Sequence, residues 1–199
     1  MRPSKRDELV QEALKVFYQN GFTATGMDLL VKKTGISKTS MYKHFRTKDD
    51  LILAVLRLRD EQLRNWFFRR VEELATRPIE QVLAIFDVLD EWFEQPEFQG
   101  CMFIKASSEF QCADDPIYSQ CTEHKKLMHS SILKYVLAIE TDEGEIPSDV
   151  AEKLAEQFML LMEGATVLKH MGVSNSAAQD AKLAAVSLLQ GNGICGYDA

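Results

Sequence analysis

The apolar positions of this chain recur every three to four residues along most of its length, which is the spacing of one face of an α-helix. Near the N-terminus the pattern forms four segments, separated by short polar turns. The segments are predicted to run over Ser4–Asn20, Thr25–Thr34, Ser37–His44 and Thr47–Thr76. No alternating strand pattern appears after Asp50, so the sequence predicts an all-α fold.

The predicted helices carry start and stop signals at their ends. Three of the four starts pair a Ser or Thr with an Asp three residues later, which is the spacing of a capping box, at Ser4, Thr25 and Thr47. Gly21 follows the first helix as a stop signal, and Gly35 lies in the turn between the second and third. Two very short helices joined by such a turn, between longer helices, are typical of a helix-turn-helix unit.

Helical periodicity continues to the end of the chain and predicts a C-terminal bundle. The further helices are expected over residues 78–95, 100–112, 116–139, 148–170 and 174–190, with a polar turn at 141–144. The chain is therefore predicted to contain about nine helices. They would form a three-helix helix-turn-helix domain over residues 1–48 and a helical domain over residues 49–199.

Charge divides the chain in the same way. The 199 residues have a formal charge of −7, which by itself disfavours a nucleic-acid partner. Residues 1–48, however, hold ten basic and four acidic residues, a charge of +6, whereas residues 49–199 carry −13. A basic head on an acidic body is expected when one end of a protein approaches phosphates.

Cellular location is indicated by what the sequence lacks. No stretch is long and apolar enough for a membrane span, and the charged N-terminus has no apolar signal core behind it. The four cysteines lie in the second half without a paired spacing, which suits a reducing compartment. We therefore expect a cytoplasmic protein that does not enter a membrane.

The third helix carries more polar chemistry than packing alone explains. Met41 and Phe45 are four residues apart and are expected to face inward with Ile36. The other positions bear small hydroxyls, cations and one aromatic hydroxyl. Such groups bind phosphate oxygens and the edges of bases, so the sequence predicts that this helix enters the major groove of DNA.

One run of the chain has a specific resemblance. The residues Gly21-Phe22-Thr23-Ala24-Thr25, and then Gly35-Ile36-Ser37-Lys38-Thr39-Ser40-Met41-Tyr42-Lys43-His44-Phe45-Arg46-Thr47-Lys48, resemble the DNA-binding head of the tetracycline-repressor (TetR/AcrR) family. The resemblance covers residues 5–55. It implies a homodimeric transcriptional repressor, with no enzymatic activity and no cofactor, that leaves a palindromic double-stranded DNA operator when a small molecule binds.

The resemblance also implies roles for individual residues of the head. The DNA backbone would be held by Thr25, Tyr42, His44 and Lys48. The bases would be faced by Lys38, Thr39 and Ser40, with Lys43 near either. Thr25 is further expected to cap a helix whose N-terminus attracts a phosphate.

The last two predicted helices are rich in small residues, which permit close helix packing. A helix pair from each of two chains would form a four-helix bundle, although burial within one chain is also compatible with this composition. Together with the resemblance, the composition predicts a homodimer formed through these two helices.

A pocket for a small apolar or aromatic effector is expected between the head and the dimer helices, where methionines lie among aromatic residues. The candidate contacts are Trp66, Phe67, Phe86, Phe93, Met102, Phe103, Phe110, Met128 and Met159. Ordinary core packing is the alternative for each of them. In the family, effector binding moves the helix after the head and changes the spacing of the two heads.

Cys101 suggests an alternative means of control. It lies at a predicted helix N-terminus with Lys105 one turn later, and both features favour a reactive thiol. The same fold would then act as a sensor of electrophiles or oxidants, whereas a buried packing role for Cys101 is the competing interpretation.

Two other chemistries are weaker. Cys121, His124 and Met128 share a helix face and carry soft metal ligands, but without a second cluster we expect no metal site. An all-α enzyme or a binding module without DNA binding is the alternative of another class. No phosphate loop, nucleophile elbow or dinucleotide fingerprint supports an enzyme.

Overall fold

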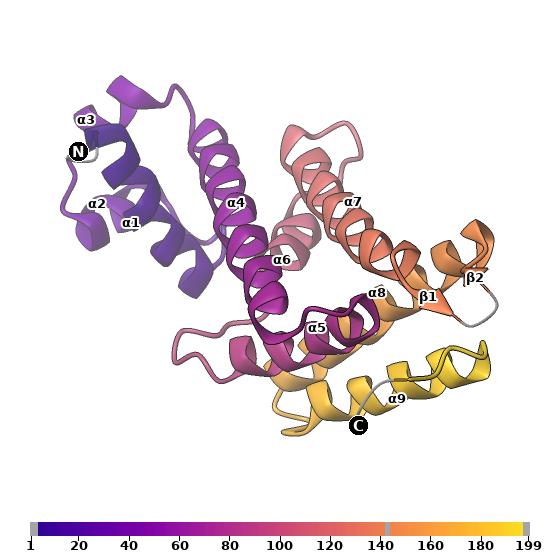
Figure 1. The fold of residues 1–199 in the computed structure, drawn as a ribbon. Coiled ribbons are helices and arrows are strands. Elements are labelled where there is room, and N and C mark those ends of the chain that lie inside the picture. The colour runs from indigo at the N-terminus through magenta and orange to yellow at the C-terminus, as the bar shows by residue number, and fades with distance from the viewer. Residues whose placement is uncertain (1–3, 142–143, 197–199) are drawn as a thin grey trace. The chain divides into compact units, whose positions relative to one another are not determined.

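The computed structural model describes residues 4–141 and 144–196, which form nine α-helices and one short hairpin (Figure 1). The helices are α1 (Lys5–Asn20), α2 (Met27–Thr34), α3 (Lys38–His44), α4 (Lys48–Leu74), α5 (Pro78–Phe93), α6 (Met102–Glu109), α7 (Pro116–Leu137), α8 (Ser148–His170) and α9 (Ala177–Gly191). The predicted all-α class is confirmed. The hairpin pairs β1 (Glu140–Thr141) with β2 (Gly144–Glu145), where the sequence had predicted only a turn.

Local hydrogen bonds explain where the first and fourth helices begin. The amide of Asp7 donates to Ser4 Oγ at 3.2 Å, and the Ser4 amide donates back to the Asp7 carboxylate. Thr47 and Asp50 exchange the same two bonds at the start of α4, at 3.0 and 3.1 Å. Each box satisfies amides that have no partner within the helix, and both predicted capping boxes are confirmed.

The predicted cap of α2 is wrong. The helix begins at Met27 after an N-cap at Gly26, and no side chain caps it. The Thr25 hydroxyl donates instead to the carbonyl oxygen of Gly21 at 2.6 Å. Because this side chain turns back across the α1–α2 loop, it is not available to the amides of the helix that follows.

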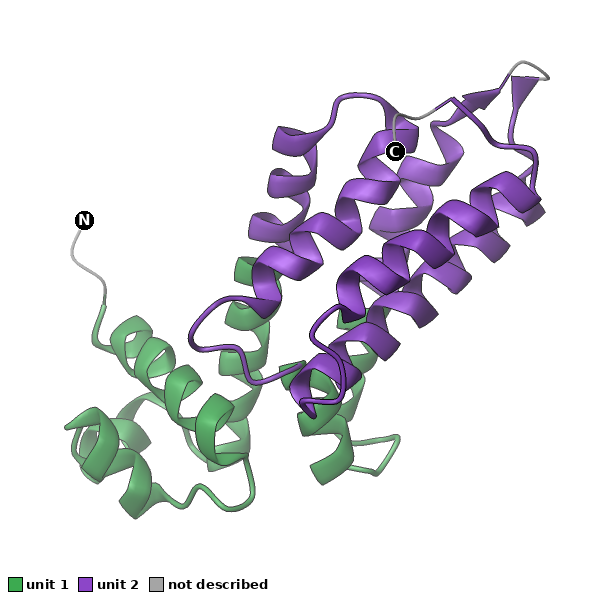
Figure 2. Cartoon of the chain, turned by 90° about the horizontal axis from the view of Figure 1, so that it is seen from below, with its two compact units in different colours: residues 1–63, 101–125 green, residues 64–100, 126–199 purple. Residues whose placement is uncertain are grey.

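The chain forms two compact units (Figure 2). Unit 1 consists of residues 1–63 and 101–125, and therefore joins α1–α3 and the first part of α4 to α6 and the first part of α7. Unit 2 consists of residues 64–100 and 126–199. The sequence-based division at residue 48 assigned residues 101–125 to the body, whereas the structure groups them with the head.

Unit 1 has an apolar core around α1. Phe17 and Phe22 are fully buried and stack with ring centroids 5.4 Å apart. Phe110, directly after α6, meets Phe22 edge to face at 6.3 Å. Met41 and Phe45 are also buried, which confirms the predicted inward face of α3.

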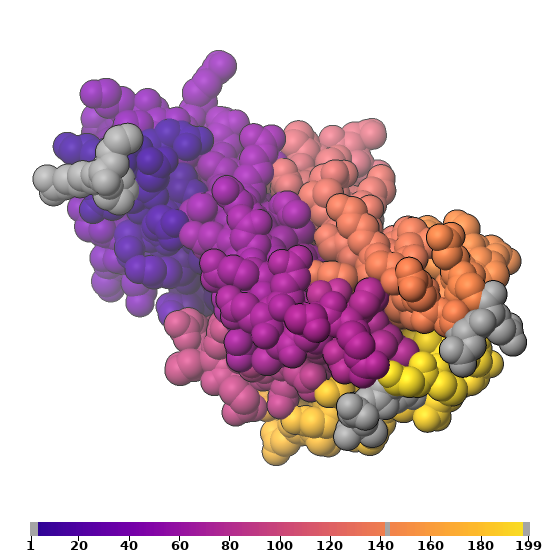
Figure 3. Space-filling view, viewed as in Figure 1, coloured from indigo at the N-terminus to yellow at the C-terminus, as the bar shows by residue number. Residues whose placement is uncertain are grey.

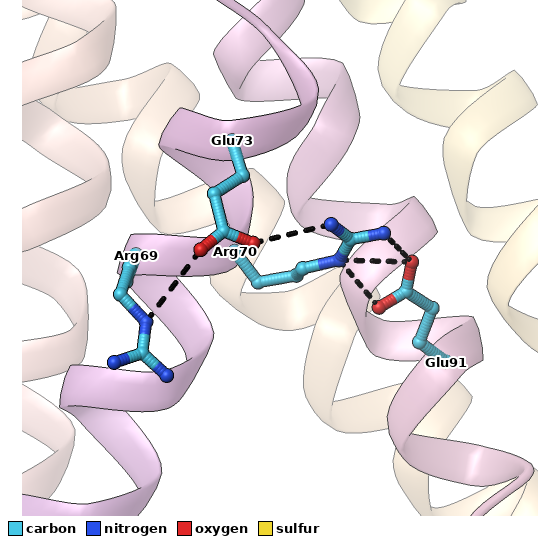
Figure 4. A network of polar contacts seen from close by, with 4 residues as sticks. All are labelled: Arg69, Arg70, Glu73 and Glu91. Atoms are coloured by element: carbon cyan, nitrogen blue, oxygen red, sulfur yellow. Dashed lines mark hydrogen bonds and ion pairs between the residues drawn. The ribbon is translucent and has the colours of Figure 1, made fainter.

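Unit 2 is built on α5, α8 and α9, which pack against one another (Figures 1 and 3). α5 is buried almost all round, as its long apolar run requires. Arg70 of α4 forms a bidentate ion pair with Glu91 of α5 at 2.9 Å, while Glu73 contacts both Arg69 and Arg70 (Figure 4). Among the described residues, no helix is both long and apolar enough to cross a membrane.

Candidate nucleic-acid interface

Helix α3 gives unit 1 a polar surface of hydroxyls and cations. Lys38, Thr39, Tyr42 and Lys43 are exposed, and Ser40 and His44 are half-buried. Tyr42 is 47% exposed, which is high for an aromatic side chain, while Met41 beside it is buried. The helix therefore divides into an inward apolar side and an outward polar side, as the sequence predicted.

The turn before α3 fixes the angle between the two short helices. Gly35 adopts a left-handed conformation, with φ of 71°, that other residues rarely take. The Thr34 hydroxyl donates to the carbonyl of Leu30 at 2.8 Å and accepts from the amide of Ile36 at 3.1 Å. Ser37 then caps α3 by accepting from the Ser40 amide at 3.2 Å. These bonds hold α2 and α3 as a helix-turn-helix pair.

Lys38 makes a contact within the pair. Its Nζ lies 3.3 Å from Asp28 of α2, in an ion pair whose side chains are both more than half exposed. Such a pair contributes little in water, so DNA phosphate can compete for this ammonium group.

Thr25 and Lys48, both predicted to hold the DNA backbone, bond to the α1–α2 loop in this structure. The Thr25 side chain is fully buried. Lys48 Nζ donates to the carbonyl oxygens of Phe22 at 3.0 Å and Thr25 at 3.3 Å. The structure thus gives both residues an internal role, and their contact with DNA stays a prediction.

A groove of about 660 Å³ runs beside the end of α3, between α1 and α4. Its basic lining residues are Arg6, His44, Arg46 and Arg57, and its acidic lining residues are Asp7, Asp50 and Glu61. The Arg6 guanidinium lies 4.9 Å from the ring centroid of Phe45. Among these basic residues only His44 is a DNA contact predicted from the sequence, although Arg6 lies in the first predicted helix of the head and Arg46 directly follows the third.

The predicted effector residues fall into both units. Met102, Phe103 and Phe110 belong to unit 1, and Trp66, Phe67, Phe86, Phe93, Met128 and Met159 belong to unit 2. Phe103 stacks on His124, and Phe86 meets Phe158 edge to face at 6.3 Å. These are contacts of packed interiors, and the effector role of these residues stays a prediction.

Cys101 is buried at the N-cap of α6 and accepts a hydrogen bond from Lys125 Nζ at 3.4 Å. Burial lowers the pKa of the neighbouring Lys105, against the opposing influence of Cys101 and Glu109. Burial likewise raises the pKa of Cys121 to about 11. Lys125 thus contacts the Cys101 sulfur. The raised pKa of Cys121 means that this buried side chain is a neutral thiol.

His124 belongs to a buried polar pair. Its Nδ1 lies 2.6 Å from Oδ1 of Asp60 in α4, and the ring of Phe103 stacks on the imidazole with centroids 3.6 Å apart. Cys121 and Met128 lie buried on the same helix. Within the described ranges, no three His, Cys, Asp or Glu side chains gather as a metal site would require.

This arrangement defines a class: a helix-turn-helix protein with a basic recognition helix and a separate helical body. The family described as "Bacterial regulatory proteins, tetR family" matches residues 9–55. The family described as "Tetracyclin repressor-like, C-terminal domain" matches residues 78–185. The chain therefore belongs to the TetR family of DNA-binding transcriptional regulators.

Individual relatives agree with this assignment. The chain is 34% identical over 86 residues to the HTH-type transcriptional repressor KstR2 of Mycolicibacterium smegmatis, covering 42% of this chain and 40% of that protein. It is 21% identical to the HTH-type transcriptional regulator YjdC of Escherichia coli, over 87% of this chain and 86% of the relative. A TetR-family regulator from Streptomyces coelicolor has the same fold, with a TM-score of 0.82, 20% identity and 94% coverage of both chains.

Proposed function

We propose that this regulator is a homodimeric repressor that places α3 of each copy in the major groove of a palindromic operator. The observation that carries the proposal is the outward face of α3, where exposed hydroxyls and cations surround a buried Met41. Its relatives KstR2, ComR and AcnR bear the name of repressor, whereas FasR is named an activator. We place its action in the cytoplasm, where the DNA of a bacterium lies.

Within this interface we assign two kinds of contact. Lys38, Thr39 and Ser40 lie in the first turn of α3 and reach the bases, because the N-terminal residues of a recognition helix enter the groove. Tyr42, Lys43 and His44 follow on the last turn and hold the DNA backbone. Arg6 and Arg46, which line the groove beside His44, extend the phosphate-binding surface.

The second copy would dock on α8 and α9. Leu160, Val167 and Leu168 of α8 are exposed, with Leu160 at 73%, and so is Met171, the C-cap of that helix. Leu183 of α9 is 65% exposed. A stripe of large apolar side chains on two adjacent helices is costly in water and favours burial against an identical pair. One dimer would then carry two heads.

We infer that a small apolar or aromatic effector releases the dimer from DNA. Support comes from the aromatic and methionine residues of unit 2, of which Trp66 and Met159 are half-buried, so that part of each side chain is accessible. Titration of candidate ligands with the Trp66→Phe and Met159→Ala variants would test whether these two side chains contact the effector. Unchanged ligand affinity in both variants would contradict such contacts.

Thiol sensing at Cys101 is a second candidate. The observation that favours it is the position of Lys125, whose Nζ lies 3.4 Å from the Sγ of Cys101 at the N-cap of α6. N-ethylmaleimide should release DNA from the wild type and from Cys112→Ser, whose exposed thiol is the matched control, but not from Cys101→Ser. Equal release in all three would exclude the mechanism.

Binding to the DNA that flanks its own gene tests the main proposal. Fluorescence anisotropy with a labelled fragment should show saturable binding that weakens steeply as salt rises, because phosphate contacts release counterions. A scrambled fragment of equal length should bind far more weakly. Equal binding to both fragments would contradict operator recognition. Absence of binding in reducing, ligand-free buffer would favour an all-α enzyme or binding module instead.

A further inference from the structure

Glu109, the last residue of α6, bonds to the α1–α2 loop of the head, which we define as residues 21–26. Its carboxylate accepts from the amide of Phe22 at 3.0 Å through Oε1, and from the amide and hydroxyl of Thr23, each at 2.5 Å, through Oε2. These residues are separated by more than eighty positions in sequence, and all lie in unit 1. Both oxygens of one carboxylate are thus used to hold two consecutive loop residues.

Lys48 donates hydrogen bonds to the same loop from which Glu109 accepts them. Its Nζ donates to the carbonyl oxygens of Phe22 and Thr25, while Glu109 receives the amides. Phe22 therefore has its amide held by α6 and its carbonyl held by the first residue of α4. We call Glu109, residues 21–26 and Lys48 the loop clamp.

The shape of the loop fits this arrangement. Gly21 has a φ of +80°, and a Cβ at this position would lie 3.1 Å from Glu109 Oε1. A side chain here would be strained in its backbone and would crowd the carboxylate. The Thr25 hydroxyl closes the loop from within by donating to the carbonyl oxygen of Gly21.

The electrostatics of the clamp favour an ionised Glu109. Burial raises the pKa of this carboxyl group. Its hydrogen bonds with Thr23 and Phe22 and the charge of Lys48 lower the pKa by more than burial raises it, so the net shift is downward. Bonds from several donors to one carboxylate are stronger than bonds between neutral groups.

We propose that Glu109 is a positioning residue of the DNA interface: it fixes the α1–α2 loop, and through the loop the ammonium group of Lys48 and the start of α2. This inference rests on the proposed DNA-binding function. It gives α6, which lies outside the helix-turn-helix sequence, a defined part in operator affinity. Since Glu109 faces the loop and not α3, it sets how firmly the head binds DNA without choosing the sequence.

Whether Glu109→Gln raises or lowers operator affinity distinguishes the positioning role from a simple effect of charge. Removing a negative charge from a DNA-binding unit strengthens DNA binding if charge alone matters. Glu109→Gln replaces one accepting oxygen by an amide that cannot accept, so we expect operator affinity about tenfold lower than wild type. Glu12→Gln is the matched control: it removes the same charge from an exposed ion pair with Lys15 in α1 and should bind as well as wild type or better.

Three measurements on the full-length protein complete the test. Anisotropy titrations with the operator fragment should show weaker binding by Glu109→Gln but the same ranking of operator variants. Amide hydrogen exchange should rise at Phe22 and Thr23 while the amides of α3 keep their protection, which a general loss of stability would not produce. Thermal unfolding should show both variants folded at the temperature of the titrations.

The outcomes are distinct. If the wild type does not bind the fragment, the proposed function fails. If the wild type binds and Glu109→Gln binds equally well or more tightly, the positioning role is overturned. Exchange that rises throughout unit 1 would also overturn it, because Glu109 would then only stabilise the fold.

Discussion

Each unit of this regulator has its own apolar core, but the two units differ in net charge and in the polar contacts that they add to that core. Unit 1 contains 14 basic and 12 acidic residues, and several of its key contacts are polar: the loop clamp and the buried Asp60–His124 pair. Unit 2 contains 9 basic and 18 acidic residues, and its helices are joined by an extensive apolar core with ion pairs at its surface. Polar contacts are directional, so they suit a unit that must present charges to DNA in fixed positions. The exposed apolar side chains of α8 and α9 suit the burial of unit 2 against a second copy that we propose.

The largest expected effect is at the buried pair. Asp60→Ala leaves His124 without this partner in a buried site, and we expect a loss of about 3–5 kcal/mol in the free energy of unfolding. Asp87→Ala in unit 2 removes a partly exposed ion pair with Lys182, and should cost less than about 1 kcal/mol. Urea denaturation measures both. Equal losses of unfolding free energy in the two variants would show that the polar pair of unit 1 contributes no more to stability than the ion pair of unit 2.

The exposed apolar face gives the next effect. Leu160→Glu together with Leu183→Glu places charges where the second copy is proposed to dock, and should give a monomer by light scattering. Operator affinity should then fall about a hundredfold, because one head binds without the other. Leu137→Glu, at the exposed end of α7, is the control and should remain dimeric. A dimeric double variant would place the interface elsewhere.

The next prediction distinguishes contacts to DNA phosphates from contacts to DNA bases. Lys43→Ala should weaken binding to all operator variants alike and reduce the salt slope by about 1, since it removes a phosphate contact. Thr39→Ala should change which variant binds best, by about 1–3 kcal/mol at one base position. The comparison is made by anisotropy over a series of salt concentrations. Two uniform losses would mean that Thr39 does not read a base.

The smallest effect is a dependence on pH. Because the folded chain lowers the pKa of Glu109 below its ordinary value of 4.5, the carboxylate stabilises the fold above that value. This contribution is lost as pH falls through the folded pKa. Wild type should therefore lose stability more steeply than Glu109→Gln below pH 4.5. Parallel curves would show that the clamp contributes nothing to folding.

Much of the fold could be predicted because its signals are local. The capping residues Ser4 and Thr47 and the turn at Gly35 lie within a few positions of the helices that they delimit. The predicted helix from Ser148 to about His170 agrees with α8 of the structure. The start of α2 was not predicted correctly, because the Thr25 hydroxyl has two possible partners and bonds to Gly21 rather than to the helix.

The non-local features could not be predicted. Nothing in the sequence around Glu109 indicates that it bonds to Phe22 and Thr23, because their proximity results from the packing of α6 within unit 1. The resemblance predicts that Lys48 holds the DNA backbone, which stays a prediction, and its bonds to loop carbonyls follow from the folded arrangement alone. The face of α3 was predictable because seven consecutive residues show it.

The central claim is that two heads of one dimer read a palindrome, and hydroxyl-radical footprinting tests it most directly. On the DNA that flanks its own gene, the wild type should protect two symmetric half-sites about 34–36 Å apart, one turn of the double helix, or a multiple of that spacing. The Leu160→Glu, Leu183→Glu variant should lose this paired protection at the same concentration. A single unpaired protected site with the wild-type dimer would contradict the account.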